Sequence, residues 1–104
     1  MAALIAIPIP PATAAQATTQ GFETNGYERI MVCADNLAGA EEVDLFIEAG
    51  GTFVALPDAA MTGTAKLTAT ITALALDAGY RYGVRKDSTV GACGVYVYGA
   101  SSAS

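Results

Sequence analysis

Most of the chain after residue 20 consists of short runs in which apolar and polar side chains alternate. The clearest runs, 42–49 and 52–56, are joined by Gly50-Gly51. This linker predicts a tight β-hairpin, because both central residues of the favoured turn need a positive φ. If Ala49 pairs with Thr52, the turn and the apolar pattern select the same register. That register places four aliphatic side chains on one face of the hairpin: Leu45, Ile47, Val54 and Leu56.

The opposite face of this hairpin carries two aromatic residues, Phe46 and Phe53. Because side chains alternate across a strand, both rings point away from the aliphatic face. Aromatic side chains of this kind are common anchors of protein interfaces. The two phenylalanines are therefore candidates for a contact surface. The alternative is that the N-terminal segment or a loop of the same chain covers them.

Other segments with the same alternation predict further strands. They are 27–34, 65–72, 79–86 and 94–98. The stretches 37–43 and 72–78 have room for one helical turn each. Strands spaced about 10 to 15 residues apart predict an all-β fold. We expect a small antiparallel β-sandwich, either immunoglobulin/fibronectin-like or a jelly roll.

Residues 1–20 differ from the rest because they carry no charge and contain Pro8, Pro10 and Pro11. Proline fixes φ and removes a backbone donor, so this segment should be extended and should not form a central strand. We expect an N-terminal arm at 1–20, a β-sandwich domain at 21–100 and a polar tail at 101–104. The apolar arm residues must be covered either by their own domain or by a neighbouring subunit, to which the arm adds an edge strand. These residues are Leu4, Ile5, Ile7 and Ile9.

The apolar N-terminus does not have the pattern of a targeting segment. A secretory signal needs a basic n-region and an uninterrupted apolar stretch, whereas here the first basic residue is Arg29 and prolines interrupt the run. Residues 2–9 are also far shorter than a membrane-spanning helix. We therefore expect neither a secretory signal nor a membrane segment.

Composition adds information about partners. Only 14% of the 104 residues are charged, against about 25% in a typical soluble domain, so we expect neighbours, including copies of this chain, to cover part of the surface. The net charge of −5 predicts repulsion from nucleic acid and from anionic membranes. Acidic residues dominate 23–58 and basic residues dominate 66–87. These segments form either two solvated faces or a head-to-tail contact between copies.

Few residues are suited to catalysis. The chain has no histidine, which removes the usual general base and the commonest zinc ligand. The adjacent acids Glu41 and Glu42 would point to opposite faces of a strand, so we expect no enzyme activity. The carboxylates between 35 and 44 lack the order of a calcium loop, and we expect no metal and no other cofactor.

Two cysteines, Cys33 and Cys93, are the only thiols. Alternation places Cys93 on the face of Val95 and Val97, but it places Cys33 on the face of Arg29. Residues on opposite faces are poor partners for a disulfide, so we expect two free thiols. Reduced thiols agree with folding in a cytoplasm.

Residues 74–84, LALDAGYRYGV, resemble the start of the sixth strand in fibronectin-type and immunoglobulin-like domains. In those families a leucine and a tight turn precede a tyrosine whose hydroxyl bonds back to the corner. Leu76, Gly79 and either Tyr80 or Tyr82 fill these places. The chain lacks tryptophan, so the antibody-type pattern is missing and a jelly roll stays open.

The chain as a whole resembles the small decoration, or cement, proteins of tailed-bacteriophage capsids. The resemblance lies in the uncharged arm, the few charges, the outward aromatic residues, the polar Ser-Ala tail and strands such as EEVDLFIEAGGTFVALPDAA. It implies a structural virion protein on the capsid surface, folded in the host cytoplasm, that binds neighbouring major capsid subunits and forms dimers or trimers. The interface candidates are Leu4, Ile5, Ile7, Ile9, Phe46, Phe53, Tyr96 and Tyr98.

Two other functions remain open. Tyr96 and Tyr98 lie on one face of the last predicted strand, where they could form a stacking platform for sugars in a glycan-binding or adhesion module. The chain could also be another small virion component, from a tail or a fibre.

Overall fold

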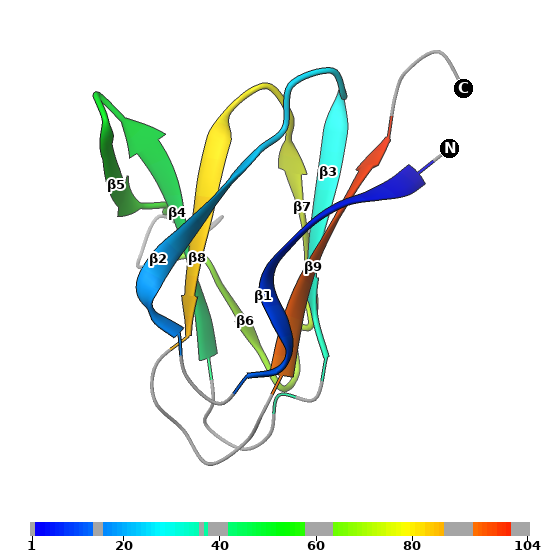
Figure 1. Ribbon diagram of the computed structural model, residues 1–104, viewed down its shortest axis with the longest axis vertical. Coiled ribbons are helices and arrows are strands. Elements are labelled where there is room, and N and C mark those ends of the chain that lie inside the picture. The colour runs from blue at the N-terminus through cyan, green and yellow to red at the C-terminus, as the bar shows by residue number, and fades with distance from the viewer. Residues whose placement is uncertain are drawn as a thin grey trace.

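In the part of the chain that the structure describes, nine β-strands form two antiparallel sheets that face each other (Figure 1), which confirms the predicted all-β sandwich. The computed structural model describes residues 2–13, 16–35, 37, 42–57, 64–86 and 93–100. Within these ranges there is no helix that could cross a membrane. The first sheet has the order β1 (Ala2–Thr13), β9 (Cys93–Ala100), β3 (Arg29–Ala34), β7 (Ala73–Asp77). The second sheet has the order β2 (Gln16–Glu23), β8 (Arg81–Lys86), β4 (Glu42–Ala49), followed by β5 (Thr52–Ala55) and β6 (Lys66–Thr68), which both pair with β4.

The connections identify the sandwich as a jelly roll. Consecutive strands β1 to β4 alternate between the two sheets, and so do β6 to β9. Only β4, β5 and β6 stay in one sheet, where β5 pairs with the second half of β4 and β6 with the first half. Together β5 and β6 fill one strand position, which leaves four positions in each sheet, as in a jelly roll. An immunoglobulin domain would instead keep its first two strands in one sheet.

The core lies between the sheets and is made of alternate residues of most strands. The first sheet contributes Ile9, Ile30, Val32, Val95 and Val97, and the second contributes Phe22, Val43, Leu45, Leu67, Tyr82 and Val84. Each of these side chains is at most 5% exposed. The predicted alternation is therefore confirmed for Ile30 and Val32, for Tyr82 and Val84, and for Val95 and Val97. Tyr80, which alternation predicts on the face of Tyr82 and Val84, lies before β8 and is 55% exposed.

The hairpin has the predicted register. Ala49 pairs with Thr52 and Ile47 with Val54, and both turn glycines have positive φ, 61° at Gly50 and 85° at Gly51. The end of the hairpin extends past the core, since Val54 is 44% exposed.

The N-terminal segment forms an edge strand of its own domain. β1 pairs with β9 from Ala2 opposite Ala100 to Thr13 opposite Cys93, so the start of β1 lies beside the end of β9 (Figure 1). The edge position agrees with the three prolines, which cannot serve a central strand. The expected boundary at residue 20 falls inside β2, and the polar tail at 101–104 lies outside the described residues.

The predicted single strand at 65–72 is wrong, because the chain turns there from the second sheet to the first. Thr68 ends β6, and its hydroxyl accepts hydrogen bonds from the backbone N–H groups of Thr70 (3.2 Å) and Ile71 (2.9 Å). A threonine hydroxyl that bonds its own backbone in this way favours a turn. Residues 73–77 then form β7, where the sequence had suggested at most a helical turn.

The corner between β7 and β8 contains the tyrosine hydrogen bond implied by the fibronectin-like segment. The Tyr82 hydroxyl donates to the Asp77 carbonyl oxygen at 2.7 Å. Gly79 has a φ of 96°, and its N–H donates to the buried Thr24 hydroxyl at 2.8 Å. Thr24 also donates to the Tyr80 carbonyl, so the end of β2 is joined to the corner.

Candidate functional site

The outer face of the first sheet carries a row of exposed apolar side chains that crosses all four strands. Leu4 on β1 lies opposite Tyr98 on β9, and Tyr98 lies opposite Met31 on β3. Ala75 on β7 completes the row opposite Met31. Leu4, Tyr98 and Met31 are 48%, 39% and 44% exposed. We call these four residues the apolar row.

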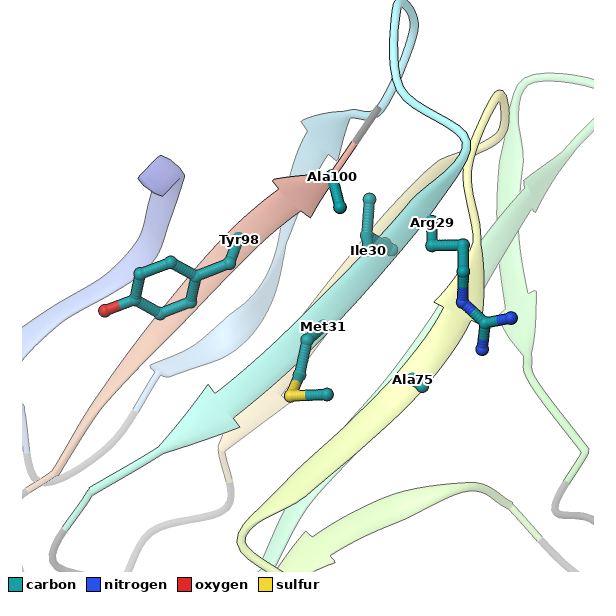
Figure 2. Close-up of a pocket in the computed structure, with 6 residues that line it drawn as sticks. All are labelled: Arg29, Ile30, Met31, Ala75, Tyr98 and Ala100. Atoms are coloured by element: carbon teal, nitrogen blue, oxygen red, sulfur yellow. The ribbon is translucent and has the colours of Figure 1, made fainter. Parts of the chain in front are cut away.

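A groove of about 320 Å³ runs beside the apolar row (Figure 2). Figure 2 shows Tyr98 and Met31 projecting from β9 and β3, with the Arg29 side chain reaching toward β7. The lining residues are Arg29, Ile30, Met31, Ala75, Tyr98 and Ala100. Arg29 is the one charged residue among them, so the groove is mostly apolar.

Two opposite charges lie at one end of this face. Arg29 on β3 is directly opposite Asp77 on β7, in the row next to the apolar row. Both residues are exposed. Neither forms an ion pair with any residue that the structure describes. The face therefore offers one free cation and one free anion side by side.

The other end of the face contains Tyr96, Cys33 and Ala73, which lie opposite one another on β9, β3 and β7. The Tyr96 hydroxyl donates to Asp35 Oδ2 at 3.2 Å, and Asp35 Oδ1 accepts the Gly94 N–H at 2.7 Å. Desolvation and this hydrogen bond raise the pKa of Tyr96. Tyr96 is thus held by its own chain, whereas Tyr98 is exposed.

The outer face of the second sheet has a different character, because its charges pair within the chain. Arg81 contacts Glu23 at 2.7 Å and Glu48 at 2.9 Å. Arg85 also pairs with Asp44 at 3.6 Å, and Lys66 pairs with Glu42 at 3.4 Å. Acidic and basic segments of the sequence thus lie on neighbouring strands of one sheet. These charges therefore neutralise one another across neighbouring strands.

Phe46 and Phe53 lie on the outer face of the second sheet, but their own chain covers much of each ring. The Arg85 guanidinium lies 4.9 Å from the centre of the Phe46 ring, and the Arg81 guanidinium lies 5.2 Å from that of Phe53. Both rings are half-buried. Among the residues that the structure describes, the groups that cover the two rings are arginines of β8, not the N-terminal segment or a loop.

The four predicted arm residues are divided between surface and core. Leu4 and Ile7 are exposed, Ile5 is partly buried and Ile9 is fully buried. The division arises because register shifts along β1 interrupt the simple alternation of faces. Only Leu4 belongs to the apolar row.

The two cysteines differ in burial. Cys93 is buried, Cys33 is half-buried on the outer face, and the two form no disulfide. Burial raises the pKa of Cys33. In the described part of the chain, no group of three or more Cys, Asp or Glu residues could hold a metal ion. Glu41, one of the carboxylates between 35 and 44, lies outside the described residues.

Comparison with protein families, curated proteins and solved structures found no match to this chain.

The structure thus brings Tyr98 and Leu4 together with three residues that sequence reasoning did not select: Met31, Ala75 and Asp77. The sequence contained one indication of this face, because alternation put the large apolar Met31 on the same side as Arg29, away from the core. An apolar face of this kind can bind another surface by excluding water.

Proposed function

We propose that this chain is a structural subunit without catalytic activity, and specifically a capsid decoration protein that stabilises neighbouring major capsid subunits. The observation that carries the proposal is the apolar row, which a free monomer would leave in contact with water. Large exposed apolar patches on folded domains mark contact sites.

Two further features support this function. The jelly-roll architecture recurs among viral capsid proteins, although fold alone does not determine function. The chain also has few charged residues, and four of its five basic residues lie on strands of the second sheet, away from the apolar row. The first sheet is therefore the better candidate for a contact with the assembly.

Binding to empty shells of a tailed phage whose genome encodes this chain tests the proposal. The purified chain should cosediment with the shells at a fixed ratio to the major capsid protein. Tyr98→Glu places a charge in the apolar row and should weaken binding at least tenfold, an effect of about 1.4 kcal/mol or more. Thr52→Glu, an exposed position on the hairpin of the second sheet, should bind like the wild type. Shells that sediment without the wild-type chain would contradict the proposal.

A glycan-binding module is the second candidate, and one observation favours it. Tyr98 is exposed beside a groove that also contains the Arg29 guanidinium, and sugars stack on such rings. Chemical-shift changes confined to Tyr98 and the groove on addition of oligosaccharides would support it. A chain that binds shells and shows no such changes would exclude it.

A further inference from the structure

We propose that the outer face of the first sheet binds a second copy of this chain across a twofold axis, with Arg29 of each copy paired to Asp77 of the other. This inference rests on the proposed function and adds a partner to it: a second copy covers Met31 and Ala75 of the apolar row, and Leu4 and Tyr98 lie outside this contact. It rests on the observation that the two charges of this face are opposite in sign, adjacent and without an ion-pair partner among the described residues.

The geometry of the sheet makes the face complementary to itself. Arg29 and Asp77 lie opposite each other on β3 and β7, and Met31 and Ala75 lie opposite each other in the next row. A twofold axis that runs along the strands between β3 and β7 exchanges these two strands. It therefore places Arg29 over Asp77 of the other copy and Met31 over Ala75 of the other copy. A twofold contact repeats each such pairing twice.

Both charge and size match in this arrangement. Opposite charges meet, and a long side chain lies over a short one, so the two faces can approach closely. β7 of the second copy then lies over β3, beside the part of the groove that Arg29 and Met31 line. Sheets that pack face to face in this way keep their strands within about 30° of each other, so rows near the axis stay in register.

A second copy explains the two adjacent opposite charges better than an unrelated partner does. A partner with one sign of charge would meet a like charge at either Arg29 or Asp77, at an energetic cost. A second copy presents both signs in the required positions. Exposed ion pairs contribute little affinity by themselves, so Met31 and Ala75 supply attraction while the charges select the partner and its orientation.

Charge reversal and mixing test the contact in solution. Sedimentation velocity over a range of concentrations should show a reversible dimer of the wild-type chain. Arg29→Asp alone places two acids together across the axis, and Asp77→Arg alone places two bases together. Each single variant should therefore dimerise at least tenfold more weakly than the wild type. The double variant R29D/D77R should dimerise like the wild type, because the exchange restores both pairs.

Mixing the two single variants is the sharper test. In a mixed dimer every contact across the axis joins opposite charges, so R29D and D77R should associate with each other although each alone is mainly monomeric. Thr52→Asp mixed with Thr52→Arg serves as the control on the second sheet, and its dimerisation should equal that of the wild type. Circular dichroism of each variant checks that the fold is retained at these exposed positions.

Two results would overturn the inference. One is a wild-type chain that stays monomeric up to about 1 mM. The other is a dimer whose affinity neither the single reversals nor the mixture alters. A monomer that still binds shells would leave the proposed function intact and remove this contact alone. A dimer with the predicted charge dependence that never binds shells would remove the decoration function and keep the contact.

Discussion

The Tyr82 ring packs in the core, and the Tyr82 hydroxyl connects β8 to the end of β7. Its ring is 3% exposed and lies 6.2 Å from the ring of Phe22, within the core. Its hydroxyl donates a hydrogen bond to the Asp77 carbonyl oxygen, at the end of β7, the strand that precedes β8 in the chain. The residue therefore fixes the corner where the chain passes from the first sheet to the second.

Tyr82→Phe should lower the free energy of unfolding by about 1 kcal/mol. The substitution keeps the ring in the core but removes the donor to a carbonyl oxygen that is partly buried. Urea unfolding at neutral pH measures the change. Tyr80→Phe is the matched control, since its side chain is 55% exposed, and it should change stability by less than about 0.5 kcal/mol. Equal effects of the two substitutions would contradict a role for the corner hydrogen bond.

Tyr82 also makes the free energy of unfolding depend on pH in the alkaline range. Desolvation, with smaller effects from Asp77 and Tyr80, raises the pKa of Tyr82 above its ordinary value near 10. At a pH between the ordinary tyrosine pKa and the raised pKa of Tyr82, the unfolded state has lost the Tyr82 hydroxyl proton, whereas the folded state still holds it. The free energy of unfolding therefore falls as pH rises above about 10. Tyr96 acts in the same direction, because its pKa is raised too. Urea unfolding from about pH 8 to pH 11 should show a smaller fall for Tyr82→Phe than for the wild type. Identical pH dependences would exclude this contribution.

At the level of elements, β2 and β8 are adapted to the ring that lies over them. Gly21 and Gly83 are opposite each other on these strands. A Cβ atom at Gly83 would lie 2.9 Å from the Phe53 ring and 2.6 Å from the Thr19 methyl group. Glycine usually weakens a strand, and here it leaves the space that Phe53 occupies.

Gly83→Ala should therefore destabilise the chain by about 1 to 3 kcal/mol, although alanine is ordinarily preferred to glycine in strands. The cause is the collision with Phe53, so the effect should depend on that ring. In a double-mutant cycle, Gly83→Ala should cost clearly less in a Phe53→Ala background than in the wild type. Additive changes would show that Phe53 does not limit the space, and the remaining cost would then arise at Thr19.

Sequence patterns predicted elements well where local chemistry determines them. The Gly50-Gly51 turn and the alternation beside it specify one register, and the structure has that register. The break after Thr68 was not predictable from alternation, because the apolar pattern continues through 65–72 while a side-chain hydrogen bond turns the backbone. β7 was missed for a related reason. It begins directly after this turn and has only five residues.

The candidate site was much less predictable, because it depends on which strands are neighbours. Leu4, Met31, Ala75 and Tyr98 belong to four separate strands and become one row only through the pairing of the first sheet. Alternation does identify the outward face of each strand. It does not tell which outward residues their own chain covers, as Arg81 and Arg85 cover Phe53 and Phe46.

On the scale of the whole molecule, the outer faces of the two sheets carry different kinds of side chain. The second sheet carries nearly all of the surface ion pairs that the structure describes, together with the aromatic rings that its arginines cover. The outer face of the first sheet has an apolar row and two free charges. A molecule with one charged side and one apolar side is suited to the fixed orientation in an assembly that the proposed function requires. This division supports a structural role more directly than either face would alone.

β1 completes the core of the sandwich within one chain, and deletion of this strand tests that role. Ile9 is fully buried between the sheets, and β1 is the only neighbour of β9 on that edge of the first sheet. Deletion of residues 1–12 should therefore abolish cooperative thermal unfolding, because it opens the core and leaves β9 unpaired. Ile9→Ala should cost about 2 to 4 kcal/mol in the full chain, whereas Ile7→Ala, at a position 43% exposed, should cost less than about 1 kcal/mol. If the truncated chain instead unfolds cooperatively near the wild-type temperature, the strand contributes little to its own domain. In that case residues 1–12 would be free to act as the arm that ties one subunit to its neighbour.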